Sequence, residues 1–214
     1  MTVNAIADAS LVIKGTQDTA YGSVGTNALS NTELKPSTSF DGVSFGKLAS
    51  AVKVLSAADE AATWTGSAGA FQATDLVTVD SAGTFYATTE YSIKSISEAA
   101  TVYVKSITLT GTDDNIDDAI RISVKIGSGA TYVYNAGGGT NSAEGVGKLT
   151  GTTWSLASKT YDSVDDTDKT WSLVADTNTV VTVNIWYEGQ DTNCFTDNIS
   201  ANDKAITIEF AKVS

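Results

Sequence analysis

Acidic side chains gather in three short stretches of the chain: TDDNIDD at 112–118, DSVDDTD at 162–168, and a looser group within 188–203. Hard cations such as Ca²⁺ prefer carboxylate oxygens, so each stretch is a candidate calcium loop. None has the residue spacing of an EF-hand, and a solvated acidic turn is the simpler explanation of each. Calcium is therefore the one cofactor that we keep as a candidate. Its candidate ligands are Asp113, Asp114, Asp117, Asp118, Asp165, Asp166 and Asp168.

The chain lacks the residue types on which many enzyme mechanisms rest. It contains no histidine, which removes Ser-His-Asp and Cys-His catalysis and also His-ligated zinc or copper. The one cysteine, Cys194, has acidic neighbours, whereas a reactive thiol needs positive charge nearby. Two facing carboxylates suffice for a glycosidase, but carboxylates occur in most loops of this chain and therefore carry little information. We predict that the protein is not an enzyme.

Aromatic residues offer a second kind of chemistry, because sugar rings stack on exposed Trp and Tyr side chains. Trp154, Trp171 and Trp186 lie in or beside strand-like runs, where packing in the core is the commoner role. A secreted carbohydrate-binding or adhesin module, with cell-surface or matrix glycans as partners, is therefore one alternative function. A calcium-dependent surface-layer or phage-structural protein is another, and it depends on the acidic stretches.

The charge balance narrows the range of partners. The net charge is −12 and the one arginine is Arg121, whereas nucleic acids are bound by clusters of basic residues. An anionic membrane surface is disfavoured for the same reason, and no apolar run reaches the length of a membrane span. No signal peptide is visible in this numbering, so the protein is either cytosolic or exported with its signal removed. The Thr, Ser and Gly-rich composition favours a secreted or cell-surface location.

These residues must be positioned by strands, because the chain is rich in Thr, Val and Gly and has almost no helical pattern. Strand-like runs recur at spacings of roughly 10–20 residues between Gly, Asn and Asp turns. This pattern predicts an all-β fold, a jelly-roll-like β-sandwich. The best helical segment is the short run AADEAA at 57–62.

Two strand-like runs show how side chains should be distributed. The run AIRISVKI at 119–126 places its isoleucines and valine on an inward face and Arg121, Ser123 and Lys125 on an outward face. The run VYVKSITLT at 102–110 changes parity near Lys105, which predicts a β-bulge.

The first fourteen residues alternate so regularly that they predict one long strand over residues 2–14. A strand at this position can complete its own sheet or fill the sheet of a neighbouring molecule. The free energies of burial, hydrogen bonding and ordering are the same in both arrangements, so they do not decide which one forms. We expect residues 15–31, rich in Gly, Asn and Ser, to form a flexible connector, and residues 32–214 to form the sandwich domain. The apolar face of the strand consists of Val3, Ala5, Ala7, Ala9, Leu11 and Ile13.

Residues 181–194, VTVNIWYEGQDTNC, and residues 205–213, AITIEFAKV, resemble the closing strands of the TasA/camelysin-like biofilm-matrix fibre subunits, a family that includes archaeal bundling-pilus-like subunits. In such proteins a strand ending in Trp-x-Glu-Gly-x-Asp runs into a loop with a cysteine. The segment LKPSTSFDGVSF at 34–45 and the AIRISV run at 119–124 are also similar. The motif residues here are Trp186, Glu188, Gly189, Asp191 and Cys194.

The resemblance implies a secreted jelly-roll subunit that polymerises by donor-strand complementation, in which the N-terminal strand of one copy completes the sheet of the next. The partners would then be copies of the same chain in an extracellular homopolymer, with neither nucleic acid nor membrane insertion involved. This structural role is our leading hypothesis from the sequence.

Overall fold

The computed structural model describes residues 1–7, 10–29, 34–48, 73–79, 82–111, 115–136, 142–191, 194 and 204–213. The prediction of an all-β fold is confirmed, and the expected helix at 57–62 lies outside the described residues. In the described part of the chain, no helix is long and apolar enough to cross a membrane. The elements are β1 (Thr2–Ala7), β2 (Leu11–Gly15), β3 (Val24–Ala28), β4 (Gly46–Leu48), η1 (Ala73–Asp75), β5 (Leu76–Thr78), β6 (Ala87–Ser95), β7 (Ala100–Thr110), η2 (Asn115–Ala119), β8 (Ile120–Ile126), β9 (Thr131–Asn135), β10 (Ser142–Thr150), β11 (Thr153–Thr160), β12 (Thr170–Leu173), β13 (Thr179–Tyr187) and β14 (Ala205–Lys212).

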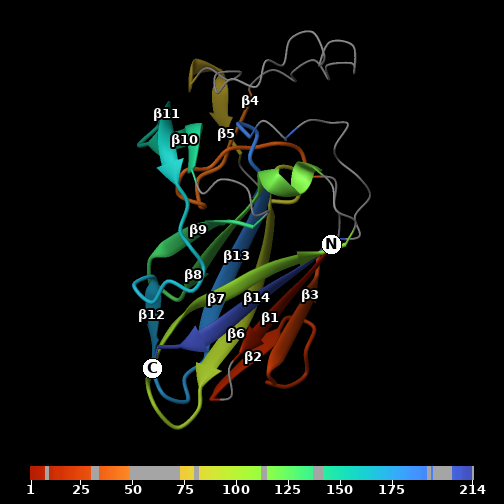
Figure 1. Ribbon diagram of the computed structural model, residues 1–214, viewed down its shortest axis with the longest axis vertical. Coiled ribbons are helices and arrows are strands. Elements are labelled where there is room, and N and C mark those ends of the chain that lie inside the picture. The colour runs from red at the N-terminus through yellow and green to blue at the C-terminus, as the bar shows by residue number, and fades with distance from the viewer. Residues whose placement is uncertain are drawn as a thin grey trace.

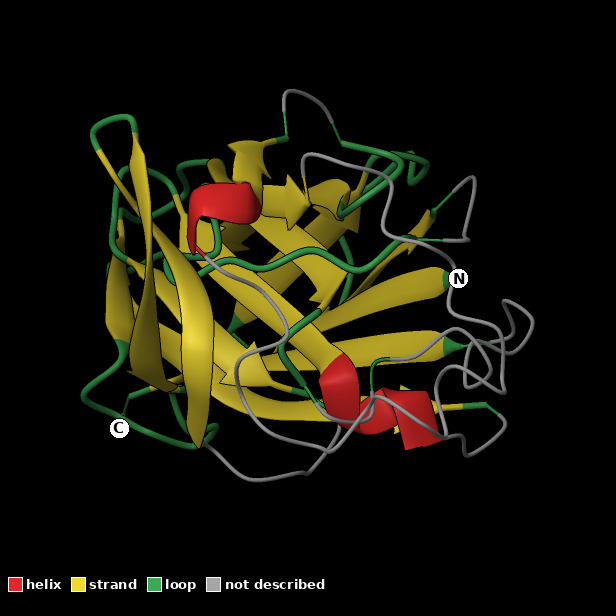
Figure 2. Cartoon of the chain, turned by 90° about the horizontal axis from the view of Figure 1, so that it is seen from above, coloured by secondary structure: helices red, strands yellow, loops and turns green. Residues whose placement is uncertain are grey.

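Two five-stranded sheets pack face to face as a β-sandwich (Figures 1 and 2). Sheet A has the strand order β12-β7-β14-β1-β3, and sheet B has the order β2-β6-β13-β8-β9. The main core lies between them and is built from alternate residues of both sheets, including Val3, Ile13, Val124 and Ile208. The small sheets β4-β5 and β10-β11 lie together at one end of the sandwich, at the top of Figure 1.

Sheet B is covered on both of its faces. The inward isoleucines and valine of β8 pack in the main core as the alternation predicts. Arg121 and Ser123 lie on the outward face, as predicted, but that face is covered and both residues are buried. The segment 37–46 lies over this outer face, where the Ser123 hydroxyl donates to the Gly42 carbonyl over 2.7 Å. Beneath it is a second, smaller core of Phe45, Val133, Tyr161 and Trp186.

The parity change in β7 is a β-bulge, as predicted. β14 pairs with β7 in an antiparallel register that matches Glu209 with Ser106 but Phe210 with Val104, which leaves Lys105 as the extra residue. The inward face of β7 therefore shifts by one position at Lys105, and the apolar side chains on both sides of the bulge stay directed toward the core.

The predicted single strand over residues 2–14 is two strands in two different sheets. β1 lies in sheet A and β2 lies in sheet B, so the chain crosses the sandwich between residues 7 and 11. The facing sheets share one core, and residues of odd number point into that core from both. The alternation therefore continues without a break while the chain changes sheets, and the sequence pattern shows no sign of the crossing.

The segment expected as a flexible connector contains β3, which pairs with β1 in antiparallel register. Its glycines serve close packing of two chain segments. A Cβ on Gly15 would lie 2.5 Å from the Thr26 carbonyl oxygen, and one on Gly25 would lie 2.8 Å from the Gly15 nitrogen. Where two backbones approach this closely, glycine is the residue that fits. The described part of this segment is thus a corner between the two sheets.

Candidate functional site

The N-terminal strand β1 is an internal strand of sheet A, held between β14 and β3. It pairs in parallel with β14, where Val3 is the partner of Ile206, and in antiparallel with β3, where Val3 faces Asn27. The other paired strands among the described residues are antiparallel. The first strand of the sequence therefore occupies an internal position in sheet A, with a paired strand on each side.

The proposed polymerisation residues divide between the two sheets. Val3, Ala5 and Ala7 are buried residues of β1, in sheet A. Leu11 and Ile13 are buried residues of β2, which pairs with β6 in sheet B. Ala9, the remaining residue of the predicted face, lies outside the described part of the chain.

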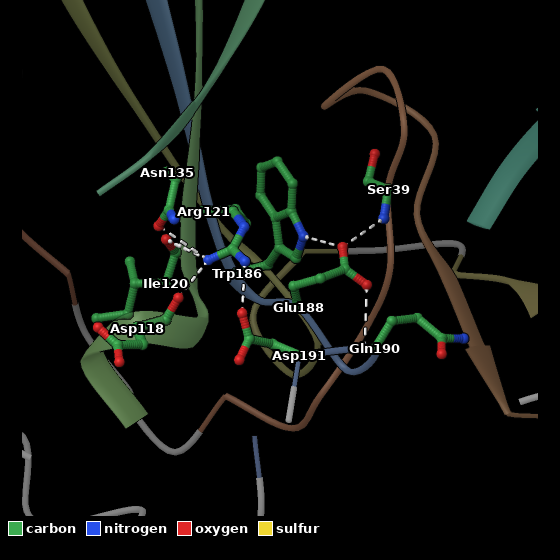
Figure 3. A network of polar contacts seen from close by, with 9 residues as sticks. All are labelled: Ser39, Asp118, Ile120, Arg121, Asn135, Trp186, Glu188, Gln190 and Asp191. Carbon is green, nitrogen blue, oxygen red and sulfur yellow. Dashed lines mark hydrogen bonds and ion pairs between the residues drawn. The ribbon is translucent and has the colours of Figure 1, made fainter. Parts of the chain in front are cut away.

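The family-like motif forms a buried polar network at the end of β13 (Figure 3). The Arg121 guanidinium, from β8, forms a salt bridge with Asp191 over 2.6 Å and also donates to Asn135 over 3.0 Å. Its plane lies over the Tyr161 ring, 4.6 Å from the centroid. Burial disfavours the charge, but Tyr161, Asp191 and Glu188 outweigh it, so the pKa of Arg121 is raised.

Glu188 lies at the centre of this network and is fully buried. Its carboxylate accepts hydrogen bonds from Trp186 Nε1 over 3.2 Å, from the Gln190 backbone over 3.3 Å and from the Ser39 backbone over 3.4 Å. Burial raises the pKa of the Glu188 carboxyl above its ordinary value. The next residue, Gly189, donates its backbone N–H to the Ser37 carbonyl over 2.8 Å. The motif therefore fastens the segment 37–46 onto sheet B.

Cys194 belongs to the same structure. It is buried, and its backbone N–H donates to the Asp191 carbonyl over 3.0 Å. Burial raises the pKa of the thiol, so the reactive thiolate is disfavoured. The motif residues Trp186, Glu188, Gly189, Asp191 and Cys194 are thus brought together in a packing role, and their arrangement presents no activated nucleophile at the surface.

The candidate metal ligands do not converge in the described part of the chain. Asp117 forms a salt bridge with Lys204 over 2.8 Å, Asp165 accepts from the Tyr103 hydroxyl over 3.3 Å, and Asp166 accepts from the Asp168 backbone over 2.9 Å. No group of three or more acidic, Cys or His side chains among the described residues could hold a metal ion. Asp118 lies beside Asp117 in η2, whereas Asp113 and Asp114 lie outside the described residues.

Three tryptophans lie in the described part of the chain, and two of them are interior. Trp171 and Trp186 are buried, which confirms core packing as their role. Trp154 is half-buried, and its ring fills the space above Gly46, where a Cβ would lie 2.9 Å from it. An open hollow of about 410 Å³ is lined by Trp171 together with Gly127, Ser128, Gly129, Thr170, Ser172 and other residues.

Sequence reasoning did not identify Ser39, Asn135 and Tyr161 as members of the network. They are separated from Glu188 and Arg121 along the chain, and a single sequence carries no signal for such contacts. No protein-family model, no curated protein and no solved structure matches this chain. The resemblance to the TasA/camelysin-like fibre subunits therefore rests on the quoted residues alone.

Proposed function

We propose that the protein is a non-enzymatic structural subunit of an extracellular filament, and that copies assemble head to tail by exchanging the N-terminal strand β1. The observation that carries the proposal is the position of β1. It is the first strand in the sequence and is paired on both sides, as an internal strand of its sheet. β1 is joined to the next strand, β2, by residues 8–10 alone, so it can leave its sheet while the strands that follow it stay in place.

Withdrawal of β1 leaves a slot that must be refilled. Both neighbours, β14 and β3, would lose their backbone partners along the whole length of β1. Unpaired backbone groups in a protein interior are costly, so an empty slot favours capture of another strand. The β1 strand of a second copy carries the same residues and restores the same contacts, which is the logic of domain swapping. Repeated in one direction, this exchange builds an open chain of subunits.

The connection between exchanged and retained parts is short. Residues 8–10 join β1 to β2, and this connection from residue 7 to residue 11 spans at most about 14 Å. Short hinges favour exchange between copies. Because the exchanged strand meets the same surroundings as before, exchange changes the interaction energy little, whereas association costs translational entropy. Stable filaments therefore depend on further contacts between subunits or on slow strand release.

The remaining features fit a structural role better than the alternatives. The polar network of Figure 3 is interior and holds a segment in place. The high negative charge supports solubility outside the cell. The resemblance to fibre subunits, on the residues quoted above, points in the same direction.

Deletion of residues 1–7 tests the proposal by negative-stain electron microscopy. The full-length protein should form filaments, and the truncated protein should not. A synthetic peptide of residues 1–14 should bind the truncated protein and restore its thermal stability. That recovery would show that the truncated domain still folds when a β1 strand is supplied. The same peptide in excess should shorten full-length filaments. Filaments of normal length from the truncated protein alone would rule out strand exchange.

A further inference from the structure

Tyr91 reaches across the sandwich to the N-terminal strand. It comes from β6 of sheet B, its side chain is 2% exposed, and its hydroxyl donates to the backbone carbonyl of Val3 in β1 over 2.7 Å. The ring also lies close to β3, where a Cβ on Gly25 would be 3.2 Å from Tyr91 Cδ1. One side chain of the facing sheet is thus hydrogen-bonded to the backbone of the strand that we propose to be exchanged.

The polar groups around Tyr91 are bonded to parts of the fold that stay in place when β1 leaves. The Asn27 side-chain amide donates to the Thr89 hydroxyl and to the Glu90 carbonyl, each over 2.7 Å. Its oxygen accepts from the backbone and the hydroxyl of Thr16 over 2.7 and 2.8 Å. These bonds link β3, β6 and the turn after β2. The bond from Tyr91 is the one in this cluster that ends on β1.

Loss of β1 would therefore break the bond from the Tyr91 hydroxyl to the Val3 carbonyl and leave the side chains of Thr89 and Asn27 as its polar neighbours. Loss of a buried hydrogen bond is costly. Burial raises the pKa of Tyr91, so the hydroxyl keeps its proton when this bond breaks. The β1 strand of another copy presents the same carbonyl and restores the bond. The hydrogen bond from Tyr91 therefore stabilises the sheet when β1 is in place, whether that strand comes from the same chain or from another copy.

We propose that Tyr91 is a latch that sets the rate at which β1 is released, a role whose biological meaning rests on the strand exchange proposed above. Backbone pairing would hold any strand of suitable shape. The latch adds a barrier specific to opening, because its bond breaks when the slot empties and forms again when it fills. It supplies the slow strand release that stable filaments require.

The test is native-state hydrogen exchange of the β1 amides in the Tyr91→Phe variant, measured on the monomer. We expect these amides to exchange about 5–30-fold faster than in the unaltered protein, which corresponds to roughly 1–2 kcal/mol of opening free energy. Amides of β8 and β13 should change much less. Tyr161→Phe is the matched control, since Tyr161 is also a buried tyrosine but belongs to the second core, beside Arg121. It should leave β1 exchange unchanged.

Two results would overturn the latch: unchanged β1 exchange in Tyr91→Phe, or an equal acceleration of all core amides, which would make Tyr91 an ordinary core residue. Filament growth provides a separate readout, in which the Tyr91→Phe protein should assemble faster at equal concentration. If β1 exchange accelerates selectively but the unaltered protein forms no filaments, the latch stands and the proposed function fails. The two proposals are therefore tested independently.

Discussion

The guanidinium of Arg121 and the carboxylate of Asp191 form a salt bridge 2.6 Å long, although the arginine side chain is 1% exposed and the aspartate 16%. The bond joins β8 to the turn that follows β13. Arg121 also donates to the Ile120 carbonyl over 3.2 Å and to Asn135 over 3.0 Å, so one side chain joins β8 to β9 and to the turn after β13 (Figure 3). A charge buried this deeply is tolerated because it is paired and hydrogen-bonded.

Replacement of Arg121 by Met should lower the free energy of unfolding by about 3–5 kcal/mol, because Asp191 loses its cationic partner in a mostly buried position. Urea denaturation measures the change. The double variant Arg121→Met/Asp191→Asn should recover part of the loss. Lys105→Met is a matched control, because the Lys105–Glu209 pair is well exposed and should contribute no more than about 1 kcal/mol. Equal losses for the buried and the exposed pair would contradict the prediction.

Glu188 gives the stability a specific dependence on pH. Its carboxyl pKa is raised by burial from an ordinary value of 4.5, so the folded protein favours the protonated form. The stabilising contribution is full below the unfolded pKa and is lost as the pH rises through the folded pKa. We expect the free energy of unfolding to fall above about pH 4.5, by at most about 1.4 kcal/mol per pH unit for this one group. Urea denaturation at a series of pH values measures the slope.

The control for this slope is Glu188→Gln, which has no proton to lose and should remove the decline. The chain contains no histidine, so no other side chain with an ordinary pKa changes charge between about pH 5 and pH 8. The comparison is one of slopes, and any constant cost of the substitution does not affect it. If the slope is the same in the variant, Glu188 is not the group responsible.

Part of this fold was predictable because local patterns follow from the geometry of a strand. The alternation in 119–126 predicts β8, and the break in parity at Lys105 predicts the bulge. Alternation tells which side chains share a face, but it does not tell what covers that face. The pattern therefore places Arg121 on the correct face of β8 but does not show that this face is buried, since the segment 37–46 that covers it lies far away in the chain.

The N-terminal region shows the same limit from another side. In both β1 and β2 the odd-numbered residues point into the core between the sheets. The alternation over residues 2–14 therefore predicts which side chains are buried without showing the change of sheet. Likewise, Gly15 and Gly25 suggest flexibility in the sequence, whereas in the fold they allow close approach. The parallel pairing of β1 with β14 joins opposite ends of the chain, and no local pattern encodes it.

Gly42 should tolerate no side chain. Its φ of +70° disfavours other residues, and a Cβ there would lie 2.3 Å from the Ser123 Cβ in β8. Gly42→Ala should cost about 2–5 kcal/mol, as strain and overpacking add together. Gly151→Ala separates the two effects, since Gly151 has a similar φ of +61° but a Cβ there would meet nothing within 4 Å. It should cost about 1–2 kcal/mol from backbone strain alone. Thermal or urea denaturation would show the difference, and similar costs for both would mean that the segment 37–46 can move away from β8.

A pair of cysteines placed across β1 and β3 should report strand exchange directly. Asn4 faces Thr26 in the antiparallel register. Ladder bonds run from Leu29 to Met1 over 3.0 Å and from Ala7 to Ser23 over 2.9 Å, so Asn4 and Thr26 form a non-hydrogen-bonded pair. The Cα atoms of such pairs are about 4.5 Å apart, within the range that a disulfide spans. The native Cys194 is buried and should not interfere.

In the Asn4→Cys/Thr26→Cys protein, oxidation of monomers should close the disulfide within one chain and prevent assembly. Oxidation after assembly should instead join the cysteine at position 4 of one chain to the cysteine at position 26 of the next, because β1 of one copy then lies beside β3 of another. Non-reducing SDS gels should show a ladder of covalent multimers that collapses to one band on reduction. Each single-cysteine variant is the control and can give nothing larger than a dimer. Filaments whose disulfides all lie within single chains would show that the subunits assemble with β1 retained in its own sheet.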